Sequence, residues 1–139
     1  MKDMGEPRIK IVAMPKDTNP SGNIFGGWIM SNIDVAGALA TRDLPIQNVV
    51  TVKVNSMEFR EPILVGDVVS YYAKIINVGN TSIKVEVEVN AERLYEGARR
   101  CVHVTSANIT YVSVDSDGKK KLIDCSKDYL LALGIKNNG

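Results

Sequence analysis

Apolar side chains fall on every face of a helical wheel between Ile24 and about Thr41. A helix with one apolar stripe buries that stripe alone, whereas a helix that is apolar all round is buried all round. One face of a sheet covers only one side of such a helix. The segment therefore predicts either a sheet that wraps around the helix or a second subunit that covers its remaining side.

The same segment carries one carboxylate, Asp34, and three glycines, at positions 26, 27 and 37. An ionised carboxylate on a buried helix costs several kcal/mol unless it is paired or hydrogen-bonded, so its presence needs a reason. A structural Asp34 would bond to the backbone or to Ser31, and a catalytic Asp34 is equally open on this ground. Each glycine costs roughly 1 kcal/mol relative to alanine, which indicates that another group approaches the backbone closely.

The rest of the chain has the alternation and the turn residues typical of strands. Valines at positions 50, 52 and 54 alternate with polar residues, and the apolar phase then shifts to Met57 and Phe59. A shift of one residue within a strand predicts a bulge, here near Ser56. The expected strands are Arg8 to Ala13, Val50 to Phe59, Val65 to Val78, Ile83 to Glu92 and Arg99 to Val114.

Turn residues and one helix complete the expected organisation. Gly79-Asn80 predicts a hairpin turn, and Ser126 is expected to cap a short C-terminal helix at about residues 126–134. Neither an internal repeat nor a linker occurs in the sequence. We therefore expect one domain over residues 1–139, with its core at about 8–115.

Charge and composition exclude several classes of partner. The chain has 17 basic and 16 acidic side chains, so it has no general attraction to nucleic acid or to an anionic membrane. The apolar helix contains Asn32 and Asp34 and is too short and too polar to span a bilayer. Cys101 and Cys125 follow no disulfide or metal spacing, and no secretory segment is recognisable, so we expect a cytoplasmic protein.

Few catalytic groups are left by elimination. His103 is the one histidine, so a single chain cannot form a metal site from histidine and cysteine side chains. The position of His103 in the middle of an expected strand favours a structural role. The sequence has no nucleophile elbow for a serine hydrolase, no phosphate-binding loop and no dinucleotide fingerprint. Neither cysteine has an evident activating partner. A carboxylate, backbone amides and water remain.

A longer motif runs from Asn19 to Asp34 with the spacing N-x-x-G-x-x-x-GG-W-x-x-x-x-x-D. The segment Pro15 to Asp34 closely resembles the signature of hotdog-fold acyl-CoA thioesterases, in the branch of small bacterial acyl-CoA hydrolases related to brain acyl-CoA hydrolase. The likeness runs from about Ala13 to Asp115. It is extended by Val49 to Val52, Ser56 to Phe59, Pro62 to Val69, Ser82 to Val87 and Tyr111 to Asp115.

The resemblance implies an α+β hotdog fold, in which a curled antiparallel sheet wraps around a long central helix. It implies a homodimer as the active unit, and commonly a homohexamer built as a trimer of dimers. It also implies hydrolysis of acyl-CoA to a free acid and coenzyme A, within fatty acid metabolism. No metal or organic cofactor is implied, since coenzyme A is part of the substrate and product.

By position, Asp34 matches the family's catalytic carboxylate and Gly27 its amide at the helix start. Asn23 stands where close relatives can carry an acidic residue and is included among the catalytic candidates. The phosphates of coenzyme A need basic or amide groups to bind them. The candidates are the turn at 79–82 and the basic residues Arg60, Lys84, Arg93, Arg99 and Arg100. The substrate-binding candidates are Asn19, Gly26, Ser56, Met57, Arg60, Gly79, Thr81, Ser82 and Arg93.

Gly27 and Asp34 are the two groups that would meet the thioester. Amides at a helix start suit the oxyanion of a thioester under attack, and Asp34 would act either as general base on water or as nucleophile. Gly27 and Asp34 lie seven residues apart, roughly 10.5 Å along a helix. One carbonyl cannot meet both groups. Either Asp34 has another role, or the site pairs Gly27 of one subunit with Asp34 of its partner, and we expect the shared site.

Two other functions compete with hydrolysis. A hotdog dehydratase or hydratase would pair a histidine with a carboxylate, so it requires His103 beside Asp34. A non-catalytic acyl-CoA-binding module would keep the pocket without needing a buried carboxylate. Thiol release from acyl-CoA separates the enzyme from the binding module.

Overall fold

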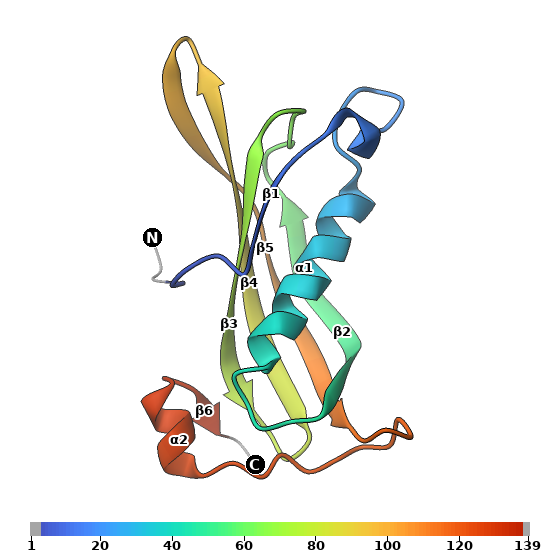
Figure 1. The fold of residues 1–139 in the computed structure, drawn as a ribbon, viewed down its shortest axis with the longest axis vertical. Coiled ribbons are helices and arrows are strands. Elements are labelled where there is room, and N and C mark those ends of the chain that lie inside the picture. The colour runs from blue at the N-terminus through green and yellow to red at the C-terminus, as the bar shows by residue number, and fades with distance from the viewer. Residues whose placement is uncertain (1–3, 138–139) are drawn as a thin grey trace.

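The computed structural model describes residues 4–137. A short 3₁₀ turn, η1, and one longer helix precede most of the strands, and a shorter helix follows them (Figure 1). In chain order the elements are β1 (Ile9–Val12), η1 (Pro15–Asp17), α1 (Gly26–Thr41), β2 (Asn48–Phe59), β3 (Val68–Val78), β4 (Ser82–Tyr95), β5 (Ala98–Val114), α2 (Lys127–Ala132) and β6 (Lys136–Asn137).

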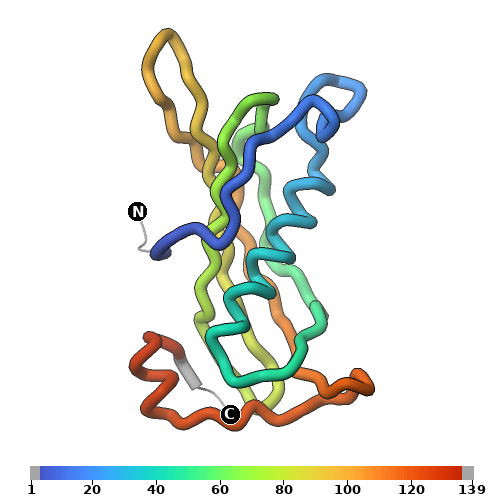
Figure 2. Tube along the Cα trace, in the orientation of Figure 1, coloured from blue at the N-terminus to red at the C-terminus, as the bar shows by residue number. Residues whose placement is uncertain are grey.

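Five strands form an antiparallel sheet in the order β1-β3-β4-β5-β2, and β6 adds a short parallel pairing to β3. The five predicted strands are confirmed, whereas β6 was not predicted. Figures 1 and 2 show α1 lying along one face of this sheet, and the hairpin of β4 and β5 projecting beyond it. The tight turns between consecutive strands are consistent with the antiparallel sheet, because antiparallel neighbours need only short connections.

The core lies between α1 and the sheet. Ile29, Ile33 and Ala36 of α1 are buried, and alternate residues of β4 such as Val85 and Val87 are fully buried opposite them. The intervening residues of β4 are polar, as the alternation in the sequence predicted; Lys84 is exposed, Glu86 and Glu88 are half-buried, and Asn90 is buried.

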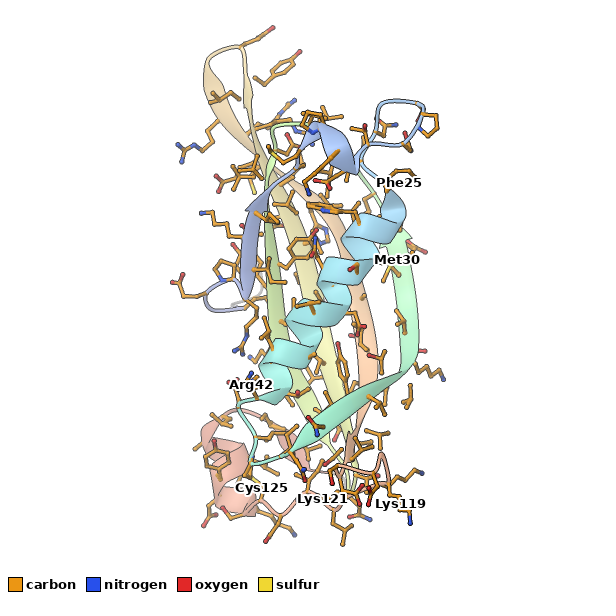
Figure 3. The ribbon with its side chains drawn as sticks, turned by 45° about the vertical axis from the view of Figure 1, so that its right-hand side comes forward. Phe25, Met30, Arg42, Lys119, Lys121 and Cys125 are labelled. Carbon is orange, nitrogen blue, oxygen red and sulfur yellow. The ribbon has the colours of Figure 1, made fainter. Side chains whose placement is uncertain are left out.

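The opposite side of α1 is not covered within one chain. Met30, Val35 and Leu39 are 47%, 49% and 37% exposed, and Met30 points away from the sheet in Figure 3. Within one chain the sheet therefore covers one side of the helix and does not wrap around it, and cover by a second subunit stays a prediction. An open groove of about 620 Å³ follows this side; it is lined by Val35, Ala38, Leu39, Thr41, Arg42, Leu44, Ile46, Gln47, Asn48 and Val49.

β2 lies at the edge of the sheet and has two irregularities. The predicted bulge near Ser56 is confirmed, since the register to β5 shifts between Asn55 and Glu58 and Ser56 has a φ of 53°. A second shift, between Thr51 and Lys53, was not predicted. The valines at positions 50, 52 and 54 are about half exposed, so their alternation does not mark the buried face of this strand.

The C-terminal helix is confirmed as α2, which is shorter than the expected 126–134. Ser126 caps it by accepting a hydrogen bond from the backbone N–H of Tyr129, at 3.1 Å. Within residues 4–137, no helix is long and apolar enough to cross a membrane.

Candidate active site

Asp34 lies in the middle of α1, half-buried, with its side chain toward the sheet. Thr51 Oγ donates a hydrogen bond to Asp34 Oδ1 at 2.7 Å, and the Tyr111 hydroxyl lies 3.1 Å from the same oxygen. Neither backbone nor Ser31, the partners considered for a structural aspartate, donates to this carboxylate in the described structure. Among residues 4–137 no lysine, arginine or histidine pairs with it. Two neutral hydroxyls therefore hold the charge.

The sheet register explains why these hydroxyls meet on one carboxylate. Thr51 of β2 and Tyr111 of β5 are direct partners across the two strands, so their side chains share the face that packs on α1. Burial, followed by the negative charge of Asp34, raises the pKa of Tyr111 far above its ordinary value. Tyr111 is thus a neutral donor. Both residues were missed from the sequence, although each lies within the strands of the family resemblance.

The start of α1 offers unpaired amides. Phe25 precedes the helix without a side-chain cap, and the first intrahelical bonds of the described structure are donated by Trp28 and Ile29 to the Phe25 carbonyl. The N–H groups of Gly26 and Gly27 are thus left without intrahelical acceptors. Apart from the adjoining residues and the nearby backbone of α1 itself, no atom of the described residues lies within 4 Å of the place a Cβ would take at either glycine. A ligand can approach this backbone, which carries the positive end of the helix dipole.

The loop before α1 is organised by Asn19. Its side-chain Oδ1 accepts hydrogen bonds from the backbone N–H groups of Ser21 and Asn23, at 3.0 and 3.1 Å, and from the Ser21 hydroxyl at 2.7 Å. Asn19 therefore has a structural task in shaping the loop. Asn23 is exposed, three residues before the helix starts.

Arg60 and His103 belong to a cluster on the sheet face opposite α1. The Arg60 guanidinium lies 3.1 Å from His103 Nδ1 and from Ser106 Oγ, and His103 Nε2 lies 2.6 Å from Glu88. Since arginine only donates, Nδ1 accepts and Nε2 carries the proton. His103 is therefore bound to Glu88 and Arg60 and not to Asp34, so the arrangement that a dehydratase requires is not found.

Arg93 is also engaged within the protein. Its guanidinium donates to the Asp67 carboxylate at 2.8 Å and to the Pro62 carbonyl at 3.0 Å. Asp67 in turn accepts from the backbone N–H of Leu64 at 2.9 Å. Arg93 holds the turn between β2 and β3, so binding a phosphate would compete with this pair.

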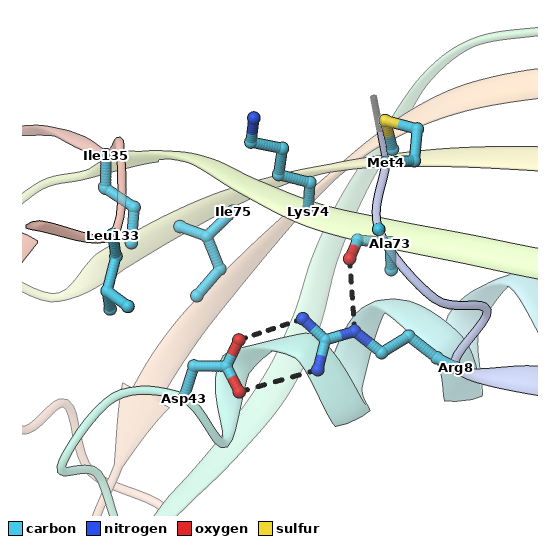
Figure 4. Close-up of a pocket in the computed structure, with 9 residues that line it drawn as sticks. Met4, Arg8, Asp43, Ala73, Lys74, Ile75, Leu133 and Ile135 are labelled. Atoms are coloured by element: carbon cyan, nitrogen blue, oxygen red, sulfur yellow. Dashed lines mark hydrogen bonds and ion pairs between the residues drawn. The ribbon is translucent and has the colours of Figure 1, made fainter. Parts of the chain in front are cut away.

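We expect Asp67→Ala to lower the free energy of unfolding by about 3 kcal/mol, since it strips a mostly buried arginine of its partner. The side chains of Asp67 and Arg93 are 2% and 19% exposed. Asp43→Ala is the control, because the Arg8–Asp43 pair of Figure 4 is 30% and 43% exposed and should contribute less than about 1 kcal/mol. Urea denaturation measures both, and equal losses would contradict the assignment.

The predicted substrate-binding residues fall into two groups. Gly26, Asn19 and the bulge carrying Ser56 and Met57 belong to the end of the molecule where α1 starts and β2 ends (Figure 1). The turn at 79–82 joins β3 to β4 at the opposite end, where its backbone bonds to β5 and to the C-terminal tail. One chain therefore does not bring Gly79, Thr81 and Ser82 together with Gly27.

No group of three or more histidine, cysteine, aspartate or glutamate side chains within residues 4–137 could hold a metal ion. Cys101 and Cys125 are both unpaired thiols. Burial raises the pKa of the Cys125 thiol, with a smaller contribution from the charge of Asp124, so this thiol is not activated.

Residues 21–98 match the family described as "Thioesterase superfamily". A protein of Haemophilus influenzae named "uncharacterized acyl-CoA thioester hydrolase" is 46% identical over 118 residues, which cover 83% of this chain and 75% of that relative. The crystal structure of a hexameric hotdog fold thioesterase of Campylobacter jejuni is similar at a TM-score of 0.88 and 56% identity, and the match covers 96% of this chain and 99% of that one.

An acyl-CoA hydrolase of Staphylococcus aureus is a more distant neighbour, with a TM-score of 0.74 and 25% identity over 94% of this chain and 74% of that one. Its structure was determined for two alanine mutants, one of an aspartate and one of a threonine. These two residues lie 17 positions apart, the separation of Asp34 and Thr51 in this chain.

Proposed function

Because this chain belongs to the thioesterase superfamily and has the hotdog fold, we propose that it hydrolyses acyl-CoA thioesters to a free acid and coenzyme A. The observation that carries the proposal is the geometry of α1. Asp34 is held in its middle by two neutral hydroxyls, and the amides of Gly26 and Gly27 are free at its start. These are the groups that hydrolysis of a thioester needs.

The helix start would bind the oxygen of the thioester carbonyl. Negative charge develops on this oxygen as the carbonyl carbon is attacked, and the Gly27 N–H would donate to it with the support of the helix dipole. The open space around both glycines leaves room for the thioester. Removing one such donor typically lowers kcat by about 10²-fold to 10³-fold.

Asp34 would supply the base or the nucleophile. As a base, it takes a proton from water while the water oxygen bonds to the carbonyl carbon; the carbon–sulfur bond then breaks and the thiolate of coenzyme A recovers that proton. As a nucleophile, its oxygen bonds to the carbonyl carbon, the carbon–sulfur bond breaks and the thiolate of coenzyme A leaves; water then hydrolyses the resulting anhydride, which frees the acid, restores Asp34 and supplies the proton that the thiolate takes up. Both routes end with the acid and the free thiol, and both need the carboxylate ionised.

A second subunit would complete each site. Gly27 and Asp34 are separated by seven residues of the continuous helix α1, roughly 10.5 Å, so one thioester reaches both only across a subunit boundary. The exposed Met30, Val35 and Leu39 give a partner an apolar surface to cover. Covering it would make the helix central, as the sequence predicts, and the hexamer of the Campylobacter jejuni thioesterase supports a homohexamer built from such dimers.

We further propose that the reaction needs no cofactor, that the chain forms one catalytic domain over residues 1–139, and that the protein works in the cytoplasm. Arg60 and Arg93 are already bonded within the chain, so Arg99 and Arg100 on the projecting hairpin are more available to the phosphates of coenzyme A. In a dimer, the turn at 79–82 would come from the partner.

Thiol release from a panel of acyl-CoAs of increasing chain length tests this function. We expect turnover of at least one acyl-CoA, with free thiol and acid formed in equal amounts. Binding of acyl-CoA without turnover would instead identify a non-catalytic binding module.

A further inference from the structure

The Tyr111 hydroxyl contacts Asp34, and neither route of hydrolysis gives this hydroxyl a role. Its hydroxyl lies 2.7 Å from the backbone carbonyl oxygen of Asp34 and 3.1 Å from Oδ1 of the same residue. A phenol has one proton, so the two oxygens share it. Tyr111 thereby ties the side chain of Asp34 to the backbone of α1.

Two donors converge on one oxygen of the carboxylate. Thr51 also donates to Oδ1, at 2.7 Å, whereas Oδ2 accepts no hydrogen bond within the described part of the chain. Donors stabilise the negative charge of the oxygen they reach, which makes that oxygen a poorer base and nucleophile. Oδ2 is therefore the oxygen available to a water molecule or a carbonyl carbon.

Tyr111 keeps its proton under all ordinary conditions. Burial is the main reason that its pKa is raised, and the charge of Asp34 adds to it. The phenol therefore acts as a donor throughout and takes no part in proton transfer.

Gly37 of α1 lies against the Tyr111 hydroxyl, which is a second observation on the contact between Tyr111 and Asp34. It lies three residues after Asp34, and a Cβ at this position would overlap the Tyr111 hydroxyl. Its backbone is helical and outside the left-handed region, so the conformation does not require glycine. Alanine would make a more stable helix. The absent side chain instead makes room for the hydroxyl beside Asp34.

We propose that Tyr111 is a positioning residue which, in the space left by Gly37, fixes the Asp34 carboxylate with Oδ2 toward the substrate. The inference rests on the proposed thioesterase function. Because Tyr111 touches Asp34 and not the thioester, its loss should slow the chemical step without weakening substrate binding. A purely structural tyrosine would not separate these effects.

Tyr111→Phe removes the hydroxyl and retains the ring. We expect kcat for acyl-CoA to fall about tenfold or more with KM unchanged. Tyr71→Phe is the matched control, because Tyr71 is equally buried against α1 but its hydroxyl contacts Asn32, at 3.3 Å. Its kcat should stay within about twofold of wild type.

A double mutant tests whether Tyr111 acts through the carboxylate. In an Asp34→Asn background, with enzyme in excess so that slow turnover is measurable, Tyr111→Phe should cause no further fall in rate. Gly37→Ala is a second variant that keeps every polar group but displaces the hydroxyl. Gly37→Ala should also lower kcat with KM unchanged. If Tyr111→Phe does not fold, Gly37→Ala replaces it as the test variant.

Three results would overturn the inference: wild-type kcat in folded Tyr111→Phe or Gly37→Ala, equal losses in Tyr111→Phe and Tyr71→Phe, or an additive loss in the Asp34→Asn background. Failure of the wild-type protein to release thiol from any acyl-CoA is a different outcome. It would overturn the proposed function, and this inference with it.

Discussion

Asp34→Ala is expected to lower kcat for acyl-CoA by about a hundredfold or more, since removal of a general base typically costs 10²-fold to 10⁴-fold. The variant should stay folded. It deletes a half-buried charge that is held by hydroxyls alone, and Thr51 and Tyr111 can turn to other acceptors or to water. Steady-state thiol release gives kcat and KM, and thermal unfolding reports whether the fold is retained.

Two variants make this result specific to the charge. Asp34→Asn keeps the shape of the side chain and an oxygen for Thr51 to bond, and it should lose as much kcat as the alanine variant. Asp43→Ala removes another aspartate close to the end of α1, where the carboxylate pairs with Arg8 (Figure 4), and it should keep wild-type kcat. Wild-type turnover in Asp34→Asn would show that Asp34 is not catalytic.

Local patterns in the sequence predicted most of the fold. Alternation and turn residues identified the five strands of the antiparallel sheet, and the apolar run identified a helix up to Thr41, the last residue of α1. The helix begins at Gly26 and not at Ile24, because Ile24 bridges back to Thr18 in the preceding loop. These features depend on neighbouring residues, which is why a sequence can specify them.

The pairing of the strands could not be predicted from the sequence as easily as the strands themselves. Thr51 and Tyr111 are 60 residues apart in the sequence, and their meeting on Asp34 depends on the register of β2 against β5. The bulge between Thr51 and Lys53 also changes which residues of β2 face the helix. Alternation within one strand indicates two faces, but it does not tell which strand lies alongside or in what register.

The apolar helix predicted either a wrapping sheet or a second subunit, and in the single chain the sheet covers only one side of it. Ile29 and Ile33 are buried against the sheet, whereas Met30 and Val35 are exposed on the other side. The residues of α1 that the sheet covers and the residues that a partner would cover are both apolar side chains of similar kinds. Hydrophobicity alone therefore cannot divide a core from an interface.

A site shared between subunits should be disabled by loss of either the Gly27 N–H or the Asp34 carboxylate. Gly27→Pro removes the N–H that would bind the oxyanion, and proline is tolerated in the first turn of a helix. Gly26 has no Cβ to clash with the proline ring, and the space beside Gly27 is open. Gly27→Pro and Asp34→Ala should each be nearly inactive as pure proteins, for two different reasons.

A mixed dimer of these variants contains one site with both defects and one site with neither, provided that Gly27 and Asp34 come from different subunits. Coexpression of the two variants with different affinity tags, followed by purification through both tags, isolates mixed assemblies. Homogeneous assemblies of each variant, carried through the same steps, give the background rate. The mixture must also exchange no subunits during the assay, which the retention of both tags verifies.

Thiol release from acyl-CoA by mixed Gly27→Pro and Asp34→Ala assemblies tests the shared site most directly. Random pairing of the two variants should restore about a quarter of the wild-type rate, and pure mixed dimers about half, because one of their two sites is intact. A rate no higher than that of the separate variants would contradict the account, and would place Gly27 and Asp34 of one subunit in the same site.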